Sequence, residues 1–130
     1  MTEIRLEHVS YAYGDEKILE DINLQVTSGE VVSILGPSGV GKTTLFNLIA
    51  GILEVQSGRI VLDGEENPKG RVSYMLQKDL LLEHKTVLGN IILPLLIQKV
   101  DKAEAIAKAD EILATFQLMA VRDKYPHELS

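Results

Sequence analysis

The chain has 130 residues, the length of one domain, and 45% of them are hydrophobic, which is enough to bury a core. Its 13 Lys and Arg residues against 19 Asp and Glu residues give a net charge of −6, so no broad basic surface indicates a nucleic-acid or anionic-lipid partner. The absence of cysteine excludes disulfides and thiolate metal sites, and we expect neither a secretory leader nor a membrane-spanning segment, since no apolar run approaches ~18 residues.

The first thirty or so residues predict an antiparallel hairpin or small sheet. Apolar and polar side chains alternate between Ile4 and Val9 and again between Ile18 and Val26, and residues 11–15 supply a turn. A second turn at residues 27–30 then leads into an apolar run, residues 31–35, which predicts a buried strand.

Residues 36–43, Gly-Pro-Ser-Gly-Val-Gly-Lys-Thr, fit the phosphate-loop pattern G-x-x-x-x-G-K-[ST] at every fixed position. The glycines allow positive φ and a close approach of backbone N–H groups to phosphate oxygens, and the N-terminus of a following helix favours the same anion. We expect Lys42 to bridge the β- and γ-phosphates and the Thr43 hydroxyl to bind Mg²⁺. A glycine-rich turn with a solvated lysine is the alternative, and the full match to the motif disfavours it.

The segment after the loop predicts a helix over residues 42–50, ended by Gly51, and a short strand over residues 57–64. That strand ends in an aspartate, Asp63, as a Mg²⁺-supporting strand does. The Asp-Gly pair and the polar residues after it are stronger turn chemistry, so we favour a hairpin turn at Asp63.

Residues 71–76 predict a further strand, and Gln77 ends it. The carboxyl end of a strand beside a phosphate loop is where open α/β sheets bind ligands. The Gln77 amide oxygen is suited to a Mg²⁺ position or to holding an attacking water, and an ordinary loop residue is the alternative.

The last third of the chain has a helical pattern. Asn90 predicts the cap of a helix with Pro94 in its first turn, and Asp101 begins a second helix with Glu104 and Lys108 as an i,i+4 pair. The predicted apolar face of the second helix consists of Ala103, Ile106, Ala107, Ile112, Leu113 and Phe116.

These segments together resemble the ATP-binding subunit of an ABC transporter along essentially the whole chain. Tyr13 lies where the family has its adenine-stacking aromatic residue, residues 36–43 match the Walker A loop, and Gln77 matches the Q-loop glutamine. Leu129 and Ser130 match the opening of the signature motif L-S-G-G-Q. Asp63 falls within the usual continuation after Walker A, which supports its assignment to a turn.

The resemblance implies an α/β fold of the P-loop NTPase type, with an antiparallel β subdomain and Walker A core over residues 1–85 and a helical subdomain over residues 86–130. It implies a Mg·ATP site in which Lys42 and Gln77 serve catalysis and Thr43 and Gln77 serve Mg²⁺. The nucleotide contacts implied are Tyr13, Gly36, Pro37, Ser38, Gly39, Val40, Gly41, Lys42, Thr43 and Thr44.

The implied partners are transmembrane permease subunits, a second ATP-binding subunit in a nucleotide sandwich and, in an assembled importer, a solute-binding protein; no nucleic acid is expected. The resemblance places such a subunit in the cytoplasm, on the inner face of the cell membrane. Residues 74–96 resemble importer subunits of the nitrate, sulfonate and taurine type. Residues 80–82 fit either a groove for a permease helix or core packing.

The match stops two residues into the signature motif, so the C-terminal part of the family's core, with Walker B, the catalytic glutamate and the switch histidine, is absent from this sequence. We therefore expect the intact subunit to hydrolyse ATP and this chain to bind Mg·ATP without meaningful turnover. The strand at residues 31–35 would keep an open edge. The alternatives are a non-catalytic nucleotide-binding fragment and another P-loop NTPase, such as a GTPase, which the absence of an Asn-Lys-x-Asp segment disfavours.

Overall fold

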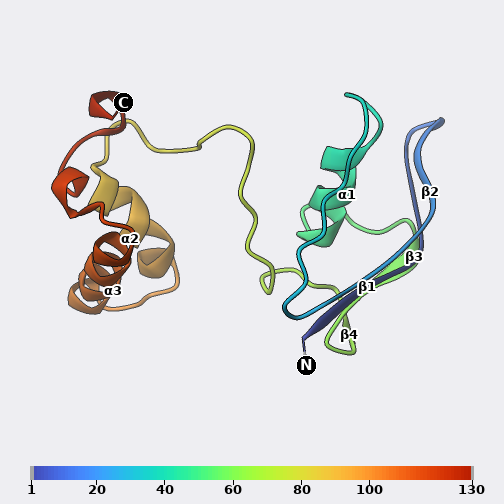
Figure 1. Ribbon diagram of the computed structural model, residues 1–130, viewed down its shortest axis with the longest axis horizontal. Helices are drawn as coiled ribbons and strands as arrows, with labels where there is room; N and C mark the ends of the chain where they lie inside the picture. The colour runs from blue at the N-terminus through green and yellow to red at the C-terminus, as the bar shows by residue number, and fades with distance from the viewer. Residues whose placement is uncertain (1, 130) are drawn as a thin grey trace. The chain divides into compact units, whose positions relative to one another are not determined.

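The computed structural model describes residues 2–129, and the chain divides into two compact units, the first ending at Met75. The first unit contains a four-stranded sheet and α1 (Lys42–Ile49) (Figure 1). The second contains α2 (Val87–Ile97) and α3 (Lys102–Thr115), which pack against each other. Among the helices of the described residues, none has the length and apolar character needed to cross a membrane.

The expected antiparallel hairpin is confirmed. The strands β1 (Glu3–Tyr13) and β2 (Glu16–Thr27) pair along their whole length, and Gly14, with φ 58°, turns the chain between them. The turn is tighter than predicted, because β1 continues through Tyr13. Register shifts in β1 accompany a left-handed backbone at His8 (φ 52°), a β-bulge that increases the local twist of the hairpin.

The strand β3 (Ser57–Leu62) pairs with β1, and the short β4 (Glu65–Glu66) pairs with β3, giving the sheet order β2-β1-β3-β4. The core of this unit forms where α1 packs Leu45 and Leu48 on the sheet. The sheet residues buried beneath the helix are Leu6, Val9, Leu19 and Ile60. Gly51, with φ 70°, follows α1 as predicted and donates its N–H to the Leu48 carbonyl at 3.1 Å.

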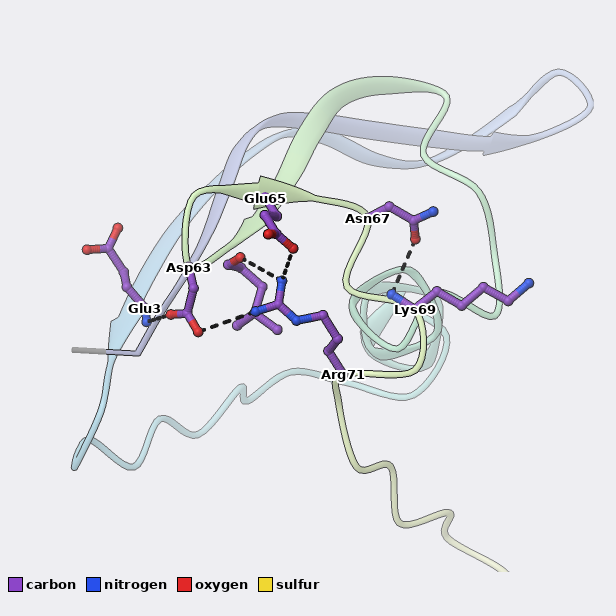
Figure 2. Close-up of polar contacts among 7 residues, drawn as sticks. Glu3, Asp63, Glu65, Asn67, Lys69 and Arg71 are labelled. Atoms are coloured by element: carbon purple, nitrogen blue, oxygen red, sulfur yellow. Dashed lines mark hydrogen bonds and ion pairs between the residues drawn. The ribbon is translucent and has the colours of Figure 1, made fainter. Parts of the chain in front are cut away.

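The turn predicted at Asp63 is confirmed, and its carboxylate is committed to the sheet. Asp63 has φ 52°, and its two oxygens accept from the Glu3 N–H at 2.8 Å and from Arg71 Nη2 at 3.5 Å (Figure 2). Arg71 Nη1 also donates to the Leu62 carbonyl at 3.2 Å and to Glu65 Oε2 at 2.9 Å. Arg71 thus holds the turn between β3 and β4, and Asp63 joins that turn to the start of β1.

Two predicted strands, residues 31–35 and 71–76, are wrong. Neither pairs with any strand among residues 2–129, and Val31 and Leu35 are 95% and 91% exposed. A strand exists only where its backbone groups find a neighbouring ladder, and the sequence pattern alone does not supply one. The predicted open edge therefore does not form, and both segments are irregular.

The first helix of the second unit begins earlier than predicted. Thr86, not Asn90, caps α2, and its Oγ1 accepts from the Gly89 N–H at 3.1 Å. The Asn90 side chain instead hydrogen-bonds to the preceding loop, where its Oδ1 accepts from the Leu82 N–H at 2.7 Å. Pro94 consequently lies inside the helix rather than in its first turn.

The cap of α3 is confirmed at Asp101, which accepts from the Ala103 N–H at 2.9 Å, and so is the Glu104–Lys108 ion pair at 2.7 Å. The predicted apolar face is confirmed at Leu113, which is buried, and at Ile106, which packs against the core shared with α2. It is wrong at the exposed positions Ala103, Ala107, Ile112 and Phe116.

The small Ala105 and Ala109 of α3 are fully buried in a cluster with Ile92 of α2, and Leu113 of the same helix is 1% exposed. Ile112 and Phe116 are 48% and 69% exposed. The helix carries two apolar stripes, and the stripe of alanines allows the closer approach of helix backbones, which hydrophobicity alone does not indicate.

Two 3₁₀ turns, η1 (Met119–Val121) and η2 (Pro126–Glu128), follow α3. Arg122, after η1, forms a two-pronged ion pair with Asp110 of α3, with Nε–Oδ1 at 2.6 Å and Nη2–Oδ2 at 3.2 Å. The Arg122 carbonyl accepts from the Leu88 N–H at 2.9 Å. This one residue therefore joins the chain after α3 to both helices of the unit.

Candidate functional site

The predicted phosphate loop lies at the N-terminus of α1, as its motif requires. Gly41 is the cap residue of the helix, with φ 105° and ψ 9°, and its carbonyl accepts from the Leu45 N–H at 2.9 Å. A glycine cap offers no side chain to the first N–H groups of the helix, which have no intrahelical partners. Those N–H groups and the positive end of the helix are therefore available to an anion.

The glycines shape the loop unequally. Gly39 and Gly41 have the left-handed backbone that the sequence predicted, with φ 82° and 105°, whereas Gly36 lies outside that region, so its predicted positive φ is wrong. A Cβ at Gly41 would lie 2.8 Å from Ile18 Cγ2 and 3.0 Å from Leu19 Cδ2. The loop therefore closes against β2 at a distance that only glycine allows.

Lys42 spans the loop. Its Nζ donates to the Gly36 and Pro37 carbonyls, each at 2.6 Å. An ammonium group has three N–H donors. Two of them join Lys42, at the end of the loop, to the two carbonyls at its start, and one is left for a ligand. The charge is thus held beside the helix N-terminus, where a phosphate oxygen would complete its hydrogen bonds.

The two threonines after Lys42 have different surroundings. Thr43 is exposed on the first turn of α1, while Thr44 is buried at 7% exposure. The more exposed Thr43 hydroxyl is therefore the better placed of the two for a cation. No group of three acidic or histidine side chains within the described residues could hold a metal, so a hydroxyl, phosphate oxygens and water are the ligands that fit Mg²⁺ here.

Tyr13 lies at the end of β1, with its side chain half-exposed and in edge-to-face contact with Tyr11 at 5.1 Å between ring centroids. Tyr11 pairs across the hairpin with Leu19, the residue that adjoins Gly41. The strand end that carries Tyr13 is therefore one strand away from the phosphate loop, and half of its aromatic side chain is exposed to a ligand.

Gln77 is exposed and belongs to the second unit, so the described geometry does not join it to the loop, and its role in catalysis and Mg²⁺ binding stays a prediction. Leu80 and Leu81 are 73% and 42% exposed within that unit. Leu129 follows η2, and Ser130, the second residue of the predicted signature opening, lies outside the described residues.

Three carboxylates of the first unit have lowered pKa values, and all three serve the scaffold. The hydrogen bond from Arg59 holds the pKa of Glu7 below its usual value, and that from His8 does the same for the pKa of Asp21. The Thr27 N–H, which donates to Glu30 at 2.7 Å, lowers the pKa of the Glu30 carboxyl. A lowered pKa makes each carboxylate a weaker base at neutral pH, so none of the three is suited to act as a general base.

Sequence reasoning missed the contacts that hold the site in place. The packing of Ile18 and Leu19 on Gly41 and a pair of hydrogen bonds between Gln56 and Ala12 are visible only in the fold. Gln56 is 44 residues from Ala12, and no local pattern marks such a bond.

Comparison with known proteins identifies the family of this arrangement. Residues 19–130 match the family model described as ABC transporter. The spermidine/putrescine import ATP-binding protein PotA of Aggregatibacter actinomycetemcomitans is 39% identical over 98% of this chain, and an uncharacterized ABC transporter ATP-binding protein, YtlC, of Bacillus subtilis is 38% identical over 100% of it. The chain spans 36% of the length of the former and 52% of the latter.

Solved structures show the same likeness. An ATP-binding cassette of an ABC transporter, MJ1267, matches with a TM-score of 0.84 and 28% identity over 100% of this chain and 60% of its own. The ATP-binding cassette MJ0796, solved as a dimer bound to ADP and Pi, matches with a TM-score of 0.77 and 27% identity over 98% of this chain and 63% of its own.

Proposed function

The chain belongs to the ABC transporter family of ATP-binding domains, as its resemblance predicted, and from this premise we propose that it carries the Mg·ATP-binding part of a transporter's energising subunit. One observation carries the proposal, namely the Lys42 ammonium held across a glycine loop at the uncapped N-terminus of α1. Such a loop presents N–H donors and one positive charge to a polyphosphate chain.

Each residue of the loop has a defined task in this proposal. The N–H groups of residues 39–44 surround the β- and γ-phosphates, Lys42 donates its remaining N–H to them, and the Thr43 hydroxyl holds Mg²⁺. Bound Mg²⁺ would neutralise charge on the phosphates. Tyr13 stacks on the purine, and Gln77 orients water or Mg²⁺ in the intact protein, whose reaction is the hydrolysis of ATP by in-line attack of water.

The proposed assembly follows the family. The chain would act with transmembrane permease subunits, a second ATP-binding subunit and, for an importer, a solute-binding protein, on the cytoplasmic face of the cell membrane. Several similar proteins are named as import ATP-binding proteins, for spermidine/putrescine or for sulfate/thiosulfate, which supports an importer without identifying the solute. The proposed subdomains are residues 1–85 and 86–130, with residues 76–85 connecting the sheet unit to α2.

The test is equilibrium binding of Mg·ATP to this chain by calorimetry, for wild type and Lys42→Ala. We expect saturable binding that the substitution weakens about 10- to 100-fold, because it removes a charged hydrogen bond to phosphate. Lys102→Ala, at the exposed start of α3, is the matched control and should leave the affinity unchanged. Equal binding by all three proteins, or no binding by wild type, would contradict the proposal.

The same experiment separates the alternative class of nucleotide. Mg·GTP is titrated into wild type under identical conditions. Stacking on Tyr13 does not distinguish adenine from guanine, so a preference must come from other contacts to the base. Tighter binding of GTP than of ATP would therefore reassign the chain to a guanine-binding P-loop protein.

A further inference from the structure

Gln56 forms a two-pronged contact with the backbone of one residue in β1. Its Oε1 accepts from the Ala12 N–H at 2.8 Å, and its Nε2 donates to the Ala12 carbonyl at 3.0 Å. A carboxamide carries an acceptor and a donor side by side, as a peptide group does. The Gln56 side chain therefore pairs with Ala12 in the way that a residue of a neighbouring strand would.

The position of this contact in the sheet explains its purpose. The ladder between β1 and β3 ends at the pair Ser10–Ser57, and β1 continues past it through Tyr11 and Tyr13. Gln56 immediately precedes β3, so its side chain adds one more rung beyond the last backbone pair. Without it, the outward-facing N–H and carbonyl of Ala12 would have only water as a partner.

Core packing holds this strand end at Tyr11 but not directly at Tyr13. Tyr13 is 51% exposed, and a register shift between Tyr11 and Ala12 interrupts the pairing with β2. Tyr11 packs against the core of the unit, and Tyr13 is joined to that core only through its edge-to-face contact with the Tyr11 ring. The hydrogen bonds from Gln56 thus hold this end of β1 on the side of β3.

We infer that Gln56 is a positioning residue for the nucleotide base, because it fixes the backbone next to Tyr13 in the orientation needed for stacking. The inference rests on the proposed function, in which Tyr13 stacks on the adenine and the loop at residues 36–43 binds the phosphates. Gln56 touches neither the base nor the phosphates. Its effect is transmitted through Ala12 to the aromatic ring.

The test compares two ligands that differ only in whether they carry a nucleoside. Affinities for Mg·ATP and for Mg·tripolyphosphate are measured by calorimetry on the wild-type chain and on Gln56→Ala. We expect Gln56→Ala to weaken ATP binding about three- to tenfold, the worth of an aromatic stacking contact, and to leave tripolyphosphate binding unchanged. A purely structural role would weaken both ligands together.

Three further variants sharpen the result. In a Tyr13→Ala background, Gln56→Ala should have no additional effect on ATP, since the ring that it orients is gone. Gln56→Glu keeps the side-chain length but sets a carboxylate oxygen against the Ala12 carbonyl, so it should also weaken ATP binding. It is the second test of the contact in case Gln56→Ala folds poorly. Gln25→Ala, an exposed glutamine elsewhere on β2, is the control and should change neither affinity.

The outcomes are distinct. A wild-type chain that binds neither ligand overturns the proposed function and this inference with it. A wild-type chain that binds both, with an unchanged ratio of the two affinities in Gln56→Ala and Gln56→Glu, overturns this inference alone. An equal loss for both ligands also overturns it.

Discussion

Gly39 and Gly41 lie in one loop and share a left-handed backbone, yet their surroundings differ. A Cβ at Gly39 would meet no atom within 4 Å, whereas a Cβ at Gly41 would meet the Ile18 side chain at 2.8 Å. The motif predicts both glycines, because its pattern is local in sequence. The reason for Gly41 was not predictable, since it depends on a strand more than twenty residues earlier in the chain.

This difference gives a prediction for the two alanine variants. Gly39→Ala adds only the strain of a non-glycine residue at positive φ, about 1–2 kcal/mol. Gly41→Ala adds the same strain and about 1–3 kcal/mol of overpacking against β2. Urea unfolding followed by circular dichroism should therefore rank Gly41→Ala as the less stable. Gly29→Ala, with φ 91° and open space around it, controls for strain outside the loop and should match Gly39→Ala. Equal losses of unfolding free energy in all three variants would show that the loop is not closely packed against β2.

Among the elements, those held by local signals were predictable. Alternating apolar residues predict the hairpin of β1 and β2, and glycines predict the end of α1 and the turn at Asp63. Capping chemistry predicts the start of α3 at Asp101. Residues 31–35 failed as a strand because a strand depends on a distant partner. The buried face of α3 was predicted wrongly at most positions, because the packing of the neighbouring helix decides which of two apolar stripes is buried.

The Asp110–Arg122 pair makes the second unit sensitive to acid. The hydrogen bond from Arg122 lowers the pKa of the Asp110 carboxyl from its ordinary 3.8. A carboxyl whose pKa is lower in the folded state stabilises that state above its unfolded pKa, and the stabilisation is lost as the pH falls through the folded pKa. We expect the helical unit to lose stability as the pH is lowered from about 4, and Asp110→Asn to remove part of that loss.

The measurement is thermal unfolding by circular dichroism at several pH values between neutrality and acid. Glu111→Gln, the exposed neighbour of Asp110 on α3, removes the same formal charge without touching Arg122 and is the control. If Asp110→Asn and wild type lose stability in parallel on acidification, the ion pair does not contribute.

Over the whole molecule, the net charge of −6 opposes the approach of a nucleotide, which is itself an anion. Attraction must then come from the immediate surroundings of the phosphates, namely the N–H groups of the loop, the N-terminus of α1 and the one remaining donor of Lys42. Composition alone excludes a broad anion-binding surface and cannot reveal this local site. The motif reveals it, and the fold shows how the loop is held.

The most direct test is a titration of the ¹⁵N-labelled chain with Mg·ATP, followed by amide NMR shifts. We expect the largest shifts on the N–H groups of residues 39–44 and smaller ones at Ala12 and Tyr13. Lys42→Ala should require about 10- to 100-fold more Mg·ATP for the same shifts. If the largest shifts lie outside the first unit, or if wild type shows none at saturating Mg·ATP, the loop is not the nucleotide site.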